Sequence, residues 1–352
     1  MLGANVNAVS SSPLATGAGG KLRTRSSAGR WAWVQRGLLL GGAVGLVLLI
    51  RSLPHADWAA LVPRVGPAFP LLAAIAIGWM ALYARGLRTV LNDAVGWGRL
   101  LKNRFLGEAY NVVMPLGDVG GDPLRVMDLG AEIGTANAVR AIVFDRLVYA
   151  ASGFLFSGVT SAVAVVAFAW DARFERLVVA YVAVALVAAV VTSLLATRAR
   201  TAIWIGRLLR LLRMRVPELP SPLPARTFVR ALGWNLAGRA GVMAEIAVLL
   251  FALGQHVRLD AVVAIAAILA IAGIIFTFIP NGLGVNEGAA VLALSLTGYG
   301  ETVGLAVGLV RRVRQLVLVA AGVALHAFWQ SRRRPSPRPA GVRDTRTADV
   351  GI

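Results

Sequence analysis

The sequence lacks cysteine and contains little charge of either sign. With no cysteine among 352 residues, disulfides, thiol nucleophiles and cysteine metal ligands are excluded. Charged residues make up 15% of the chain, against ~25% in a typical soluble domain. Hydrophobic residues make up 57%, and the mean hydropathy is +0.71. Long apolar runs of this kind predict an all-α, polytopic membrane protein.

Acidic residues are scarcer than basic ones. The chain has 17 Asp and Glu and 36 Lys and Arg, nearly all of the latter arginine. The basic residues gather in both tails and in segments 85–104 and 197–230. That alternation follows the rule that cytoplasmic loops are positive, so it does not indicate nucleic-acid binding. We expect a multi-pass protein of a bacterial inner membrane, with both termini in the cytoplasm.

Apolar runs predict six full crossings, at about 31–50, 68–84, 138–169, 177–196, 232–253 and 302–328. The flanking tails, 1–30 and 331–352, are expected to be disordered and cytoplasmic. A proline-rich connector divides the membrane domain, 31–330, into halves of about 31–216 and 226–330. Just before the connector, 203–216 has arginines on one helical face and Leu and Trp on the other, which predicts an interfacial helix.

The stretch from Gly107 to Arg125 does not have the composition of a membrane-spanning helix. It holds three carboxylates, two prolines and four glycines within 19 residues. Such backbone is tolerated at membrane depth only where protein buries it or where it lines a wet cavity. We therefore expect a broken, re-entrant segment beside a polar site. An ordinary cytoplasmic loop is the alternative.

A second broken segment, 280–288, follows the same plan at a shift of 165 residues, the separation of Pro115 and Pro280. The shift also aligns Gly117 with Gly282, Asp122 with Glu287, and Arg146 with Arg311. On the predicted topology the two segments enter from opposite faces. Inverted repeats with broken helices are typical of secondary transporters, whose sites lie where the half-helices meet.

Ionisable residues recur within the predicted crossings, although each costs at least ~2.5–3.5 kcal/mol at the bilayer centre. Internal neutralisation would pair Arg239 with Glu245, Arg146 with Asp122 or Asp145, and Arg311 with Glu287. The arginines of the last crossing nevertheless outnumber nearby acids. Surplus guanidinium suits a phosphate, which it can hold with two hydrogen bonds, and a lipid headgroup is the natural anion at this depth.

Two motifs carry a family resemblance. The pattern Glu108-x-x-Asn111-x-x-x-Pro115-x-x-x-x-Gly120-Gly121-Asp122-x-x-Arg125 resembles the transmembrane flippase region of lysylphosphatidylglycerol synthetases, closest to the stand-alone, hopanoid-associated branch. Ile279 to Gly288 resembles that family's Pro-Gly-Gly-x-Gly-x-x-Glu-Gly motif, with Asn281 in place of a Gly. The resemblance implies lipid translocation or handling. Only 22 residues follow position 330, so we do not expect the aminoacyl-transferase domain of two-part members.

These patterns define an expected headgroup site. Its binding residues would be Glu108, Asn111, Asp118, Asp122, Arg125, Asp145, Arg146, Arg239, Glu245, Glu287, Arg311 and Arg312. Its backbone would be shaped by Pro115, Gly117, Gly120, Gly121, Pro280, Gly282, Gly284 and Gly288. No cofactor or resident metal is expected, because the three histidines are scattered.

Three functions fit this site. The first is a flippase or transporter for an anionic or isoprenoid-derived membrane lipid. The second is a membrane-embedded enzyme or subunit of glycolipid or hopanoid synthesis, in which Asp118 and Asp122 would act as acid and base or bind a divalent cation. The third is a scaffold for lipid-synthesis enzymes.

Overall fold

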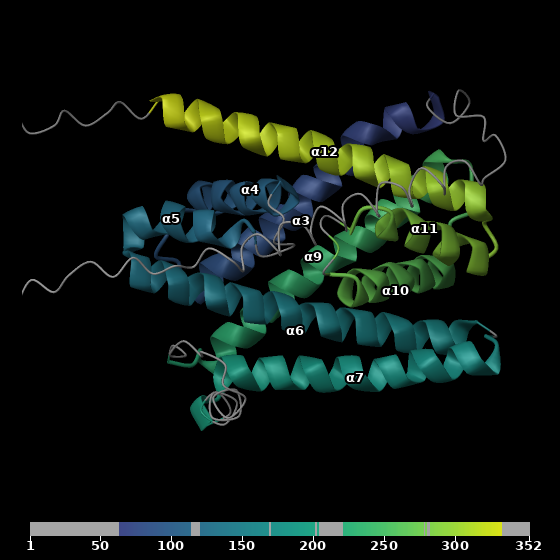
Figure 1. Cartoon of the computed structure of the whole chain (residues 1–352), viewed down its shortest axis with the longest axis horizontal. Coiled ribbons are helices and arrows are strands. Elements are labelled where there is room, and N and C mark those ends of the chain that lie inside the picture. The colour runs from purple at the N-terminus through teal and green to yellow at the C-terminus, as the bar shows by residue number, and fades with distance from the viewer. Residues whose placement is uncertain are drawn as a thin grey trace, which may run out of the picture.

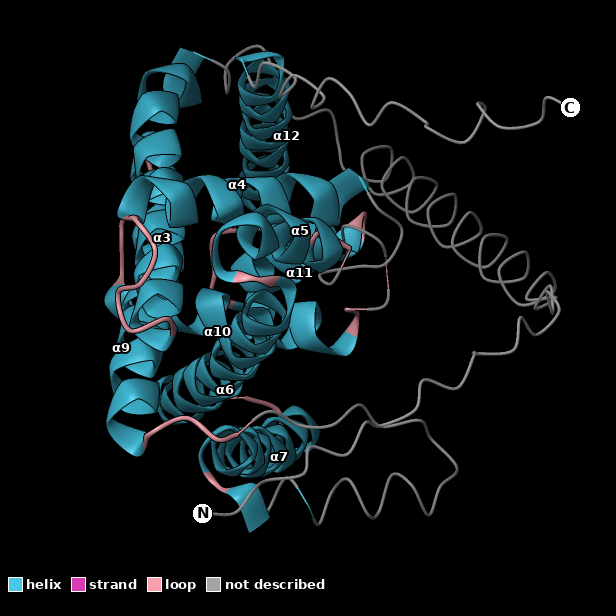
Figure 2. Ribbon diagram, turned by 90° about the vertical axis from the view of Figure 1, so that its left-hand side faces the viewer, coloured by secondary structure: helices cyan, strands magenta, loops and turns pink. Residues whose placement is uncertain are grey.

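Most of the described part of the chain is helical, and no strand occurs in it. The computed structural model describes residues 63–113, 120–168, 170–200, 203, 221–277, 279 and 282–332. The elements are η1 (Gly66–Ala68), α3 (Phe69–Val90), α4 (Trp97–Val113), α5 (Asp122–Ile133), α6 (Thr135–Ala167), α7 (Ala172–Thr197), α9 (Ala225–Ala252), α10 (Leu259–Ile275), α11 (Val285–Leu296) and α12 (Glu301–Arg332). They form one bundle, in which α7 lies at the periphery against α6 (Figures 1 and 2).

Four of the described helices are long and apolar enough to cross a membrane: Pro63–Val90, Thr135–Ala167, Ala172–Thr197 and Ala225–Ala252. They correspond to four of the six expected crossings. The sixth expected crossing, 302–328, lies in α12. This helix has 32 residues, but three arginines near its middle lower its hydropathy. The first expected crossing, 31–50, lies outside the described residues, as do the tail 1–30, residues 333–352 and most of 203–216.

The expected basic loop 85–104 is largely helical, which corrects the sequence-based boundary. Arg85 and Arg88 belong to the last turns of α3, and α4 begins at Trp97, within the segment expected to be a loop. The turn between them is made at Asn92 and Asp93, which have φ of 50° and 62°. Asn and Asp tolerate this left-handed region better than other residues with side chains, so a short turn suffices.

The helix lengths repeat along the chain. The run Pro63–Val90 has 28 residues and is followed by α4, α5 and α6 with 17, 12 and 33. After α7, helix α9 has 28 residues, and α10, α11 and α12 have 17, 12 and 32. At 1.5 Å per residue, neither 12- nor 17-residue helices span the ~30 Å hydrocarbon core. Each half therefore contains a long helix, two short ones and another long one.

Packing also follows the repeat. Helix α4 of the first half packs against α12 of the second, and α10 of the second packs against α6 of the first, while α3 and α9 pack against each other. The short pair α4 and α5 lies toward one end of the long axis, and α10 and α11 lie toward the other (Figure 1). Helices α6 and α12 run in opposite directions along that axis (Figure 1).

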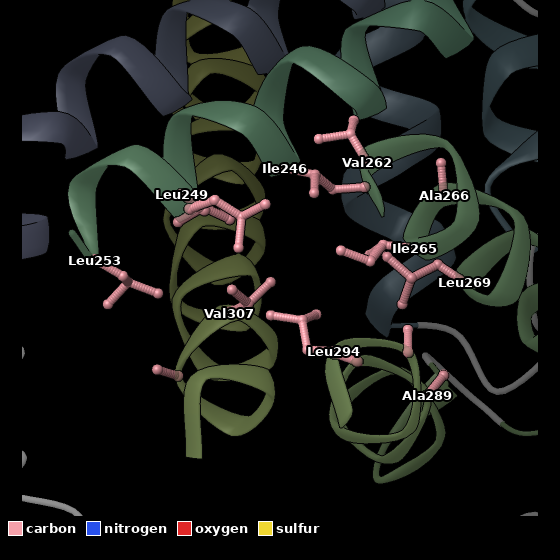
Figure 3. Close-up of a cluster of buried hydrophobic side chains, with 14 of the residues drawn as sticks. Ile246, Leu249, Leu253, Val262, Ile265, Ala266, Leu269, Ala289, Leu294 and Val307 are labelled. Atoms are coloured by element: carbon pink, nitrogen blue, oxygen red, sulfur yellow. The ribbon is translucent and has the colours of Figure 1, made fainter. Parts of the chain in front are cut away.

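The largest apolar core joins α9, α10, α11 and α12. Ile246, Leu249, Ile265 and Leu294 are fully buried there and point toward one another (Figure 3). Small residues let α12 approach α11 closely, as in other membrane helix pairs. A Cβ added at Gly304 would lie 2.5 Å from Cα of Val291. That distance leaves no room for a methyl group at Gly304.

Gly304→Ala should therefore lower stability by about 1–3 kcal/mol, the usual cost of overpacking. Gly233→Ala is the matched control, because it also lies within a helix and has open space around its Cβ position; alanine should leave stability equal or slightly higher there. Thermal unfolding of the purified variants in detergent measures both. Equal melting temperatures for Gly304→Ala and the parent protein would contradict the close packing of α11 and α12.

Candidate functional site

The first charged cluster is built around Asp122, the first residue of α5. Arg146 of α6 holds this carboxylate with two hydrogen bonds, Nε to Oδ2 at 2.6 Å and Nη2 to Oδ1 at 2.7 Å. Gly121, just before Asp122, donates its backbone N–H to Oδ1 of Asn111 at 2.7 Å. A Cβ on Gly121 would lie 2.2 Å from the carbonyl oxygen of Gly107. A glycine at this position therefore lets the start of α5 dock directly on α4.

Arg125, one turn into α5, is almost fully buried at 1% exposure. Its Nη2 donates to Oδ2 of Asp145 at 2.7 Å, and its Nε donates to Oδ1 of Asn103 at 3.1 Å. Its Nη1 lies 3.4 Å from Oδ1 of Asp122. Arg104 closes the cluster, 3.9 Å from Asp145 and 3.7 Å from Glu108. Every carboxylate in this cluster thus has an arginine partner, as buried charge requires.

The second cluster is built around Glu287, the third residue of α11 and fully buried. Its Oε2 accepts from the backbone N–H of Gly284 at 2.9 Å, and its Oε1 accepts from Nε of Arg312 at 2.6 Å. Arg312 also donates from Nη2 to the carbonyl of Gly282 at 3.2 Å. Gly282 and Gly284 have φ of +54° and +78°, a left-handed conformation that favours glycine, so the backbone can turn into α11 here.

Two of the expected ion pairs are wrong, and one is confirmed. Asp122 does pair with Arg146, but Glu287 pairs with Arg312 instead of Arg311. The reason is helical geometry: Gly308 lies against Glu287, and Arg312 is one turn further along the same face of α12. Arg311, turned away by one residue, reaches Glu245 at 3.3 Å, and Arg314 reaches the same carboxylate at 3.1 Å.

Arg239, the third arginine with an expected partner, does not pair with Glu245. It donates from Nε to Oγ of Ser152 at 3.0 Å and from Nη2 to the carbonyl of Tyr149 at 2.8 Å, both on α6. Its guanidinium lies 4.5 Å from the centre of the Tyr149 ring. All these contacts are with neutral groups.

Three aromatic side chains connect the clusters and form what we call the aromatic row: Trp79, Tyr83 and Tyr149. Ring centres are 5.5 Å apart between Trp79 and Tyr83, and 5.4 Å apart between Tyr83 and Tyr149. Arg314 lies 5.9 Å from the Trp79 ring, and Arg104 lies 4.8 Å from the Tyr83 ring. Ring faces attract cations, so the row adds to the stabilisation that these two arginines receive from their carboxylate partners.

A cavity of about 280 Å³ lies between the two halves. Helices α3, α4 and α6 contribute Trp79, Tyr83, Glu108 and Tyr149, whereas α9, α11 and α12 contribute Arg239, Val242, Asn286, Glu287, Gly308, Arg311, Arg312, Arg314 and Gln315. Four arginines and two carboxylates therefore face one small space. Its lining favours an anion.

Comparison with known families agrees with these motifs. Residues 38–322 match the model of the lysylphosphatidylglycerol synthase transmembrane region, which covers most of the chain. The chain belongs to this family. Comparisons with curated proteins and with solved structures gave no match.

In this member of the lysylphosphatidylglycerol synthase transmembrane family, the predicted site residues divide into two groups. Glu108, Arg239, Glu287, Arg311 and Arg312 line the cavity. The second group forms ion pairs and hydrogen bonds beside the cavity: Asn111, Asp122, Arg125, Asp145, Arg146 and Glu245. Asp118 lies outside the described residues, together with Pro115, Gly117 and Pro280.

Sequence reasoning missed the aromatic row, Asn103, Arg104 and Asn286, and it did not place Arg314 in the site. Part of the aromatic row could have been found from the sequence, because Trp79 and Tyr83 are four residues apart and so share one face of a helix. Arg104 lies in the basic segment 85–104, and its local sequence gives no sign that it is buried. The described residues contain no group of three or more His, Cys, Asp or Glu side chains placed to hold a metal ion.

Removing Arg312 should destabilise the protein more than removing Arg311. Arg312→Gln leaves Glu287 buried without an arginine, which should cost about 3–5 kcal/mol. Arg311→Gln leaves Arg314 on Glu245, so the loss should be about 1.5 kcal/mol, that of one charged hydrogen bond. Melting temperatures in detergent test the order, and a larger loss for Arg311→Gln would contradict the observed pairing.

Proposed function

We propose that this protein translocates a membrane lipid, or otherwise handles one, by binding its headgroup in the cavity between the two halves. The observation that carries the proposal is the cavity lining, in which both halves contribute and four arginines face two carboxylates. Membership of the lysylphosphatidylglycerol synthase transmembrane family supports a lipid-related role. Arginine holds phosphate with two parallel hydrogen bonds, so a phosphate headgroup suits this lining.

The size of the cavity indicates how a lipid would bind. Pockets that enclose a drug-sized ligand occupy ~300–1,000 Å³, and this cavity is about 280 Å³. A headgroup fits such a space, whereas acyl or isoprenoid chains do not. The chains would remain in the bilayer while the headgroup passes through the protein.

The two halves would act as an inverted repeat. Three features support this arrangement: nearly equal helix lengths, the reciprocal packing of α4 on α12 and of α10 on α6, and the opposite directions of α6 and α12. The short pairs α4–α5 and α10–α11 would then be re-entrant from opposite membrane faces. Sites at the junction of such repeats are reached from alternate sides as the halves rock.

A binding or transport role fits the acidic residues better than a catalytic one. Asp122 is held by two hydrogen bonds from Arg146 and lies near Arg125, so it is poorly placed to accept a substrate proton. We therefore propose no enzymatic activity for this chain. Lipid-synthesis enzymes would be functional partners that supply the lipid.

Transport can be tested by blocking the cavity. Val242→Trp places a large side chain in the lining, so it should slow the movement of fluorescent phosphatidylglycerol across proteoliposomes by about tenfold or more. Val229→Trp is the matched control, since Val229 is on the same helix but 63% exposed. Parent protein that moves lipid no faster than empty liposomes would refute the function, and equal rates for both variants would refute the cavity as the route.

Orientation can be tested on the cysteine-free background of the chain. We propose that the protein lies in a bacterial inner membrane with the ends of α3 and α7 and the start of α9 in the cytoplasm, because basic residues gather there. Asp171→Cys, between α6 and α7, should then react with an impermeant maleimide added outside intact cells, and Ser221→Cys should react only after lysis. The reverse pattern would invert the proposed topology.

A further inference from the structure

A second cavity, of about 350 Å³, lies where α3 turns into α4, where α5 meets α6 and where the chain enters α9. We call it the end pocket. None of the residues that line it belongs to the cavity between the two halves. Its inner wall is apolar, because Val90, Ala141, Phe144 and Leu223 are all buried. An apolar ligand group would therefore lose its contact with water there.

The walls of the end pocket are set by regular backbone structure. One face of α6 supplies residues at helical spacing: Asn137, Arg140, Ala141 and Phe144. The turn after α3 contributes Asn92, which has a φ of 50°. The chain entering α9 is held by Leu223, whose backbone N–H donates to the carbonyl of Ala196 at 2.9 Å. The pocket is therefore preformed, as ligand pockets usually are.

The rim of the end pocket carries hydrogen-bond donors and one positive charge. Asn92, Asn137 and Arg140 line the pocket and are exposed. Among the described residues, no Asp or Glu lines it. Asp93, next to Asn92 in the turn, is held by Arg88 at 2.8 Å. With an arginine and no carboxylate in its lining, the rim favours a negatively charged group.

Arg140 stands at the boundary between this rim and the apolar wall. Its Nη2 donates to the carbonyl of Ser221 at 3.3 Å, and its guanidinium lies 5.9 Å from the centre of the Phe144 ring. In the described part of the chain, Arg140 forms no ion pair with a carboxylate. Both of its contacts are with neutral groups, so its charge is not balanced. Arginine has five N–H donors, enough to hold a carboxylate in addition to the Ser221 carbonyl.

We infer that the end pocket binds a single-chain amphiphile that ends in a carboxylate, a ligand of the fatty-acid class. The chain lies against the apolar wall, and the carboxylate accepts hydrogen bonds from Arg140. A volume of about 350 Å³ is near the lower end of the ~300–1,000 Å³ typical of ligand pockets, so it suits one short chain and excludes a two-chain phospholipid. A phosphate monoester carries about −1.5 to −2 charges, more than one arginine balances, so a carboxylate fits better.

The experiment uses the absence of cysteine from the chain. Thr227→Cys places a thiol in the pocket lining, and Arg226→Cys places one on the neighbouring residue outside it. Alkylation by a soluble maleimide is followed in neutral detergent micelles with decanoate as the probe. Decanoate at about ten times its Kd should slow alkylation of Thr227→Cys about tenfold, because occupied protein does not react. Arg226→Cys should react at an unchanged rate.

Chain length and charge are tested on the Thr227→Cys background. From octanoate to decanoate, each added methylene should tighten binding by up to about fourfold. Arg140→Gln should weaken decanoate binding about tenfold, the effect of losing a charged hydrogen bond, and leave decanol binding unchanged. Arg140→Lys should retain part of the affinity for decanoate. Arg230→Gln, which removes an exposed arginine of α9 outside the lining, is the matched control and should keep the parent affinity.

A blocking variant tests the location of the site. Ala94→Trp places a large side chain at an exposed position of the lining, so the fold should tolerate it. It should abolish protection of Thr227→Cys by both decanoate and decanol. Full protection in Ala94→Trp would contradict binding within the pocket.

The outcomes are distinguishable. Failure of decanoate to slow alkylation of Thr227→Cys, or equal slowing of Arg226→Cys, overturns the end pocket as a binding site. Equal affinity for decanoate, decanol and decyltrimethylammonium, or unchanged affinity for decanoate in Arg140→Gln, overturns the carboxylate assignment. Protection by phosphatidylglycerol and none by decanoate overturns the single-chain assignment. The assay requires no lipid transport, so it decides the inference whether or not the proposed function holds.

Discussion

Buried charge is the constraint on which the rest of this structure depends. A guanidinium or carboxylate removed from water is tolerated only where a partner of opposite charge and further hydrogen bonds compensate for its lost hydration. Asp122, Asp145, Glu245 and Glu287 all meet that condition through arginines from other helices. The short helices α5 and α11 place the Asp122 and Glu287 carboxylates against α6 and α12. The first turns of α5 and α11 therefore present these two carboxylates to their arginines, whereas Asp145 and Glu245 lie within the continuous helices α6 and α9.

Glycines determine how closely the charged partners can approach. Gly121 brings α5 against α4, and Gly308 brings α12 against Glu287, so each ion pair forms across a helix contact that any larger residue would widen. Gly153 has the same role for Arg239. Close packing at small residues stabilises membrane helices because apolar surface alone gives little gain inside lipid. In this protein the same packing also fixes the geometry of the charged groups.

The two halves share a plan but differ in electrostatics. In the first, three carboxylates and three arginines balance in a compact cluster: Glu108, Asp122 and Asp145 with Arg104, Arg125 and Arg146. In the second, Arg311 and Arg314 share the single carboxylate of Glu245, so positive charge is left facing the cavity. Aromatic rings from the first half lie beneath these cations and beneath Arg239. The cavity thus combines a half whose charges balance with a cationic half, a lining that suits an anion.

Hydropathy and the spacing of Pro and Gly are local properties, so they were enough to predict the membrane class, the helical fold, the family and the helix breaks before Asp122 and Glu287. The sequence also identified nearly every buried carboxylate, since charge in an apolar run is conspicuous. Only the tertiary structure decided the pairing. Arg311 and Arg312 are neighbours in sequence but point about 100° apart around α12, so the contact of α12 with α11 at Gly308 selects which one reaches Glu287. Arg239 and the aromatic row meet only through helices distant in the chain, and no local pattern encodes that meeting.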